Sequence, residues 1–248
     1  MIPIGFFSLL TGAVLWEVTA RAYDILFLPP LSAVLARLAR MTADGQILSS
    51  LGNSLFNLAV GYILAAVVGI GVGLLMGSYR KVEAALDIYV YAFLTAPSLV
   101  FAPIFFSIFG LGRGPILGVI VMNAIFIVII NTADAVRSVP RPLVEMARSL
   151  CATDRQVTRR VIVPAAMPLI MTGLRVGMVR AVKGMVVGEM FIAIVGLGAV
   201  IRNAGRRLDV ETSLAVLLVI IAVALLANAL VSGLDRRVNG WLPSTARS

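Results

Sequence analysis

Four charged residues lie inside an otherwise apolar segment and are the first candidates for chemistry. Arg175, Arg180, Lys183 and Glu189 all fall within residues 169–197. At about 100° per residue on a helix, their side chains spread over roughly half the circumference and form no single stripe. Charges inside a membrane usually face water or the protein interior, so all four are candidates for lining a translocation path.

The depth of these residues separates their expected roles. Arg175 lies early in the segment, and its long side chain could reach the cytoplasmic interface. Arg180 and Lys183 lie deeper, and we expect at least one of them to line a polar path. A positive lining would suit an anion such as a sulfonate, nitrate or carboxylate.

The sequence offers no residue set for catalysis, metal binding or nucleotide binding. It has no histidine and a single cysteine, Cys151, and its carboxylates are scattered among loops. Cys₂His₂ zinc sites, Ser-His-Asp triads and imidazole bases are therefore excluded. The Gly-x₄-Gly-Lys-Ser/Thr phosphate-binding loop is also missing. We expect no catalytic residue, no metal and no cofactor on this chain.

The composition is that of a membrane protein. Of the 248 residues, 60% are hydrophobic and only 13% are charged, and the mean hydropathy is +1.02. Soluble domains carry about 25% charged residues. The net charge of +9 would suggest nucleic-acid binding in a soluble protein, but here the basic residues cluster in short stretches between apolar runs, as orientation signals do.

Apolar windows, most of them free of charge, predict an all-α membrane protein with about six transmembrane helices in one domain, residues 1–248. A span needs about 20 mostly apolar residues. The first 16 residues carry no charge, so the first span is expected to be retained rather than cleaved as a signal peptide. The predicted spans are residues 1–22, 53–77, 86–109, 114–133, 169–197 and 212–234.

The distribution of lysine and arginine predicts the orientation of these spans. The side that holds residues 78–84, 133–168 and the tail from Asp235 carries 11 basic residues, and the opposite side carries 7. By the positive-inside rule, both chain ends and the 133–168 loop are predicted to be cytoplasmic.

The second predicted span is rich in glycine, at positions 61, 69, 71, 73 and 77. Small residues let helices approach closely in lipid, so tight helix packing is the expected reason. A flexible gate is the alternative.

The loop at 138–164 has an amphipathic helical pattern that is too short and too charged to span. We expect two helices, broken near Cys151. Thr153 and Gln156 have the spacing of a capping box at the start of the second helix, and Pro164 and Pro168 are expected to end that helix. Such a helix pair could dock in a groove of a soluble motor, or it could simply lie on anionic lipid.

The same loop resembles the EAA loop of binding-protein-dependent ABC importer permeases, whose usual form is Glu-Ala-Ala, three residues, then Gly. Glu145 and Ala147 match the first and third positions, Met146 replaces the middle Ala, and Cys151 stands in place of Gly. Cysteine adopts a positive φ less easily than glycine, so the turn is either less tight or strained. The resemblance implies that the residues contacting an ATPase are Glu145, Met146, Ala147, Arg148, Leu150, Cys151, Ala152 and Thr153.

Further matches to the nitrate/sulfonate/taurine branch of this family run along nearly the whole chain. They include residues 53–77, Ala96-Pro97-Ser98, residues 109–112 and Gly196-Leu-Gly198. The resemblance implies a type I ABC importer permease in the bacterial inner membrane, surrounded by lipid. It implies a second permease copy, two cytoplasmic ATPase subunits that bind ATP and Mg²⁺, and a periplasmic or lipid-anchored binding protein.

Two other functions remain open from the residues alone. A stand-alone secondary transporter or channel would need no ATPase, and a membrane anchor would transport nothing. Co-purification with an ATPase subunit would separate these possibilities. The substrate is not fixed by this chain, because selectivity in such systems is expected to reside largely in the separate binding protein.

Overall fold

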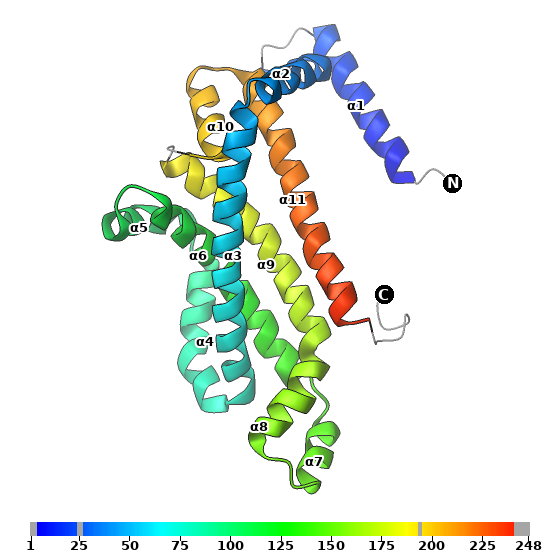
Figure 1. The fold of residues 1–248 in the computed structure, drawn as a ribbon, viewed down its shortest axis with the longest axis vertical. Coiled ribbons are helices and arrows are strands. Elements are labelled where there is room, and N and C mark those ends of the chain that lie inside the picture. Colours follow the sequence, from blue (N-terminus) through cyan, green and yellow to red (C-terminus); the bar gives the residue numbers. More distant parts are fainter. Residues whose placement is uncertain (1–3, 24–26, 193–194, 241–248) are drawn as a thin grey trace. The chain divides into compact units, whose positions relative to one another are not determined.

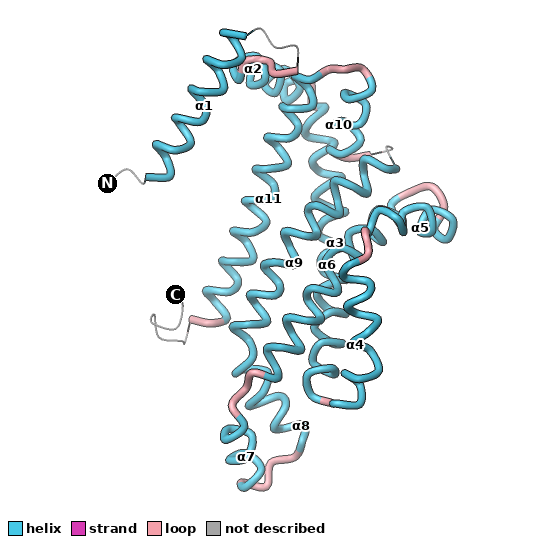
Figure 2. The backbone as a smooth tube through the Cα atoms, turned by 180° about the vertical axis from the view of Figure 1, so that it is seen from behind, coloured by secondary structure: helices cyan, strands magenta, loops and turns pink. Residues whose placement is uncertain are grey.

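The computed structural model describes residues 4–23, 27–192 and 195–240, and within these ranges it contains helices and no strand (Figures 1 and 2). The all-α prediction is confirmed. The helices are α1 (Ile4–Tyr23), α2 (Leu31–Ala43), α3 (Gln46–Ser78), α4 (Arg80–Thr95), α5 (Ala102–Phe109), α6 (Arg113–Arg137), α7 (Arg141–Ser149), α8 (Asp154–Val157), α9 (Val163–Ile192), α10 (Leu197–Arg206) and α11 (Val210–Val238).

The chain forms two compact units. Unit 1 comprises Met1–Leu55 with Glu189–Val223, and unit 2 comprises Phe56–Gly188 with Ala224–Ser248. Three long helices, α3, α9 and α11, contribute residues to both units.

Four helices in the described ranges are long and apolar enough to cross a membrane: Gln46–Ser78, Arg113–Arg137, Asp154–Phe191 and Val210–Val238. Four of the six predicted spans fall on them. A fifth crossing is possible through a helix pair, Arg80–Thr95 with Ser98–Phe109, which is bent by 98°. The count of six is therefore approximate.

The predicted span at 86–109 is not one straight helix. Ala96 is extended, with ψ 133°, because the residue before a proline is disfavoured in the helical region and Pro97 has no N–H to continue the ladder. A short 3₁₀ turn, Ser98–Phe101, then leads into α5, which runs crosswise to α4 (Figure 2).

In unit 1, α1 covers residues 4–22 of the first predicted span, whose first three residues lie outside the described part of the chain. This helix is not among those long and apolar enough to cross a membrane. Glu17 pairs with Arg21 and accepts hydrogen bonds from the amide and hydroxyl of Ser32. These bonds tie the end of α1 to α2, an amphipathic helix that apolar windows did not predict.

Asp209 starts α11 in unit 1. Its carboxylate accepts hydrogen bonds from the Thr212 amide at 2.9 Å and the Thr212 hydroxyl at 2.6 Å. Burial acts to raise the pKa of Asp209, but the bonds from Thr212 and the charges of Arg37 and Arg207 outweigh it and hold that pKa below its ordinary value. The cap is thus ionised at neutral pH.

In unit 2, α6 is the central helix, and α3 packs along it in parallel. A Cβ added at Gly61, Gly69, Gly73 or Gly77 would collide with Ile120, Val128, Thr132 or Val136 respectively. Each partner lies 59 positions further along the chain, so the two helices run in the same direction with small residues at every contact. Gly71 has no neighbour within 4 Å. Tight packing is thus confirmed for four of the five glycines.

Helix α9 packs against an adjacent side of α6, and Val128 contacts glycines of both α3 and α9. Here the partners run in the opposite order: Gly173 lies against Asn131, Gly184 against Asn123, and Gly188 against Ile116. The two helices are therefore antiparallel, and glycines again allow the close approach.

The expectation that Pro164 and Pro168 end the second loop helix is wrong. Residues Asp154–Phe191 form one continuous helical stretch, with Pro168 inside α9. A π-turn at Thr158–Ile162 precedes Pro164, and Val163 N–H bonds to the Thr158 carbonyl. The π-turn replaces the α-helical hydrogen-bonding pattern just before Pro164, where a proline would otherwise disrupt an α-helix. The helix therefore continues past Pro164.

Candidate functional site

Helix α7 is held to the end of unit 2 by one face. Val144 packs against a buried cluster that includes Ala135, Val136, Ala166 and Ile170. In an α-helix at about 100° per residue, Met146 lies roughly 160° from Val144. The outer face therefore points away from this cluster of α6 and α9 residues, and Figure 1 places α7 at the lower end of unit 2.

That outer face is apolar. Leu143, Met146 and Leu150 are 41%, 60% and 78% exposed, and we call these three residues the α7 stripe. Glu145 is also exposed and has no ion-pair partner among the described residues. A row of uncovered apolar side chains beside a free carboxylate is a surface suited to another protein.

The C-terminal end of α7 is a Schellman motif. Cys151 N–H donates to the Arg148 carbonyl at 2.9 Å, and Ala152 N–H donates to the Ala147 carbonyl at 3.2 Å. Cys151 occupies the position where this motif prefers glycine, and its φ is 56°. The turn is therefore tight, and the left-handed conformation of a non-glycine residue makes it strained.

Replacing Cys151 with glycine should stabilise this turn by about 1–2 kcal/mol, the cost of a left-handed non-glycine residue. Hydrogen–deuterium exchange of the amides of residues 150–152 should slow by about five- to thirtyfold. Cys151→Ala keeps the Cβ and should leave exchange near the wild-type rate. Equal slowing in both variants would show that the backbone strain is not the cause.

The second loop helix begins as expected. Thr153 and Gln156 form a complete capping box, in which Gln156 N–H donates to Thr153 Oγ1 and Thr153 N–H donates to Gln156 Oε1. Arg148 and Asp154 also pair across the turn at 3.4 Å, although both are exposed. The two predicted helices, their break and the cap are confirmed.

Ion pairs place three segments at the same end of unit 2. Arg137, at the end of α6, pairs with Glu83 in the first turn of α4. Arg175 on α9 pairs with Asp235 near the end of α11, with 2.5 Å between Nη2 and Oδ2. The α3–α4 turn, the α7–α8 loop and the end of α11 thus share one end, as the basic-residue count grouped them. Which side of the membrane this end faces stays a prediction.

The four charged residues of 169–197 lie in different environments. Arg175 is paired with Asp235, Lys183 is exposed, Arg180 is half-buried and Glu189 is fully buried. The structure describes the first three in unit 2 and Glu189 in unit 1. Whether any of them lines a path stays a prediction.

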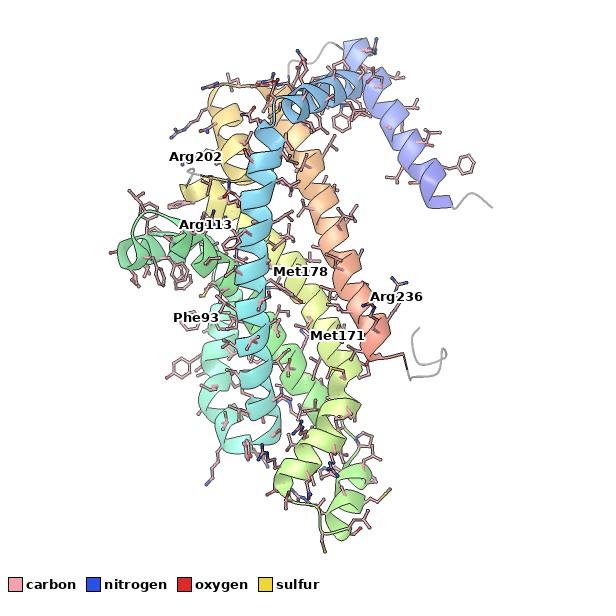
Figure 3. The ribbon with its side chains drawn as sticks, viewed as in Figure 1. Phe93, Arg113, Met171, Met178, Arg202 and Arg236 are labelled. Carbon is pink, nitrogen blue, oxygen red and sulfur yellow. The ribbon has the colours of Figure 1, made fainter. Side chains whose placement is uncertain are left out.

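Arg180 lines a polar pocket of about 220 Å³ beside the break between α4 and α5. The break contributes Pro97 and Ser98, and α6 contributes Asn123. Phe93 forms a further part of the lining, and Figure 3 shows it near the end of α4. Sequence reasoning assigned no role to Ser98 or Asn123, although a polar residue inside an apolar span is itself a signal.

Glu189 is the centre of a buried network in unit 1. Its carboxylate accepts hydrogen bonds from Ser54 Oγ at 2.7 Å and Gly198 N–H at 3.1 Å. Ser54 Oγ in turn accepts from Leu197 N–H at 2.8 Å. Gly196 has a φ of 94°, and any Cβ there would overlap the carboxylate. The network joins α3, the end of α9 and the start of α10.

Residues 65–240 match the family described as "Binding-protein-dependent transport system inner membrane component". This range includes α6, the α7 loop, the polar pocket and α9. The chain belongs to this family. It is therefore a multi-pass inner-membrane permease, and the recognition of the EAA-loop family from sequence is confirmed.

Named relatives of this permease resemble it over most of its length. The taurine transport system permease protein of Escherichia coli (strain K12) is 31% identical over 97% of this chain and 89% of its own. The formylaminopyrimidine transport permease protein of Halalkalibacterium halodurans is 30% identical over 96% of this chain and 95% of its own.

Among solved structures, the permease resembles a chain of the inward-facing MetNI methionine ABC transporter. The TM-score is 0.67 at 19% identity, over 76% of this chain and 94% of the other. At that identity the likeness concerns the fold, which is that of a type I ABC importer permease, as predicted.

Proposed function

We propose that this permease is the membrane subunit of an ATP-driven importer, and that α7 is the surface on which a cytoplasmic ABC ATPase subunit acts. ATP and Mg²⁺ would bind to that subunit. Two permease copies, two ATPase subunits and a periplasmic or lipid-anchored binding protein would complete the transporter. The α7 end of unit 2 would then face the cytoplasm, together with both chain termini.

The α7 stripe carries this proposal. A helix that merely rested on lipid would turn its apolar residues toward the bilayer, which lies on the side of the membrane-spanning helices. Here Val144 occupies that side, and Leu143, Met146 and Leu150 are exposed on the other. An apolar helix face that points away from its own protein suits a groove on a soluble partner. A stand-alone transporter would have no use for it.

Met146→Asp should strongly weaken association with the ATPase subunit. A charge at the centre of the α7 stripe would have to be desolvated in the groove, and the few residues that dominate an interface, which cluster near its centre, contribute about 2 kcal/mol or more each. The amount of ATPase that co-purifies with the permease from its native membrane, identified by mass spectrometry, should fall by at least about tenfold.

Arg141→Asp is the matched control. Arg141 is exposed on α7 but lies roughly 140° around the helix from Met146, and an acidic residue suits the first turn. This variant should retain the ATPase. Unchanged ATPase recovery with Met146→Asp, in a permease that still runs as a single species, would refute the proposed surface.

A further inference from the structure

We infer that the polar pocket beside the α4–α5 break binds the anionic group of a small organic solute, a sulfonate or carboxylate, through Arg180 and Ser98. That this anion is the transported cargo rests on the function proposed above, whereas the binding itself does not.

Arg180 brings a positive charge that no carboxylate in the described part of the chain neutralises. It lies within the membrane-spanning stretch Asp154–Phe191 and is half-buried. Among the described residues it has no ion-pair or hydrogen-bond acceptor. The carboxylates of unit 2 that form ion pairs do so with other arginines: Glu83 and Asp134 with Arg137, Asp154 with Arg148, and Asp235 with Arg175. A charged guanidinium inside a membrane span needs a counter-ion. A bound anion is the simplest counter-ion for Arg180.

Ser98 provides a second donor in the same pocket. Asn123 Nδ2 donates to Ser98 Oγ at 2.8 Å and to the Val119 carbonyl at 2.9 Å, so both hydrogens of this amide are used. The bond from Asn123 occupies an acceptor site of the Ser98 hydroxyl and leaves its proton free to donate. A guanidinium and a hydroxyl on one pocket match the oxygens of a sulfonate or carboxylate.

The helix packing brings these donors together. Asn123 lies against Gly184, where a Cβ on α9 would stand 3.0 Å from the Asn123 side chain. Because glycine allows α9 to approach α6 there, Arg180, four residues earlier, reaches the same pocket as Asn123 and Ser98.

The size and walls of the pocket define the rest of the ligand. Its volume of about 220 Å³ lies below the roughly 300–1,000 Å³ of pockets that hold drug-sized ligands. Phe93 supplies an aromatic surface that is fixed by stacking on Phe126, with 5.5 Å between ring centroids. A charged group on a short hydrocarbon chain fits both features.

The test uses a single reporter thiol in the pocket of the permease complex in lipid nanodiscs. Cys151→Ser removes the only natural cysteine, and Ala96→Cys, at another residue that lines the pocket, adds the reporter while Ser98 keeps its hydroxyl. We measure its modification rate with the anionic reagent methanethiosulfonate ethylsulfonate and with its trimethylammonium analogue. Arg180→Gln should lower the anion-to-cation rate ratio by about tenfold, since one nearby charge is lost. Arg180→Lys should preserve the ratio.

Two controls make the outcome decisive. Lys183→Gln removes a neighbouring charge that is exposed and does not line the pocket, so the ratio should not change. Ethanesulfonate should protect the thiol, and its neutral counterpart ethyl methyl sulfone should not. An unchanged ratio with Arg180→Gln, or equal protection by the sulfone, would overturn the inference. Labelling needs no ATPase, so a failure of the α7 proposal would leave this result unaffected.

Discussion

Replacing Gly73 with alanine should destabilise the permease strongly, and replacing it with leucine should prevent folding. An added Cβ would lie 2.6 Å from the backbone carbonyl of Ile129 and 2.5 Å from the Cβ of Thr132. Neither is the flexible end of a side chain, so α3 and α6 would have to separate. Overpacking of a close contact costs about 1–3 kcal/mol for one methyl group, and more for a larger side chain.

Gly71 is the matched control on the same helix. It has no neighbour within 4 Å, and alanine is favoured over glycine in a helix by about 1 kcal/mol. In detergent, a fluorescence size-exclusion thermostability assay should give a lower melting temperature for Gly73→Ala and an unchanged or higher one for Gly71→Ala. Gly73→Leu should yield no monodisperse peak. Equal melting temperatures for the two alanine variants would contradict the close α3–α6 contact.

The long helices were predictable because lipid sets a simple requirement. A span must be about 20 residues long and nearly free of charge, and the windows at 53–77, 114–133 and 212–234 meet it. The window at 169–197 was predicted from its apolar residues in spite of its four charges. The α4–α5 break was not predicted, because an apolar window records composition and ignores the geometry that Pro97 imposes on Ala96. Helices α2 and α10 were missed for a similar reason, since they are short and amphipathic.

The two parts of the candidate site differ in how far sequence could predict them. The α7–α8 turn is local, so Thr153, Gln156 and the motif around Cys151 were enough to predict its break and its cap. The polar pocket joins Ser98, Asn123 and Arg180, which are far apart along the chain. Their proximity depends on glycine contacts between helices, and no local pattern reports those.

Glu189→Ala should unfold unit 1 or loosen it severely. The carboxylate is fully buried and accepts hydrogen bonds from Ser54 and Gly198. Each buried donor that loses its acceptor costs about 1–3 kcal/mol, so two such losses amount to about 2–6 kcal/mol. That is a large fraction of the roughly 5–15 kcal/mol that stabilises a typical protein. Amide exchange in α10 should rise by at least about thirtyfold, the equivalent of about 2 kcal/mol.

Conservative and control variants separate the network from a general effect of losing a charge. Glu189→Gln retains one carbonyl oxygen as an acceptor, so its exchange rates should lie between those of the wild type and Glu189→Ala. Glu211 also belongs to unit 1, has no ion-pair partner among the described residues, and Glu211→Ala should leave α10 protected. If Glu189→Ala also left α10 protected while changing solute uptake, the carboxylate would act on the transported solute, and its hydrogen bonds to the start of α10 would not be what holds that helix.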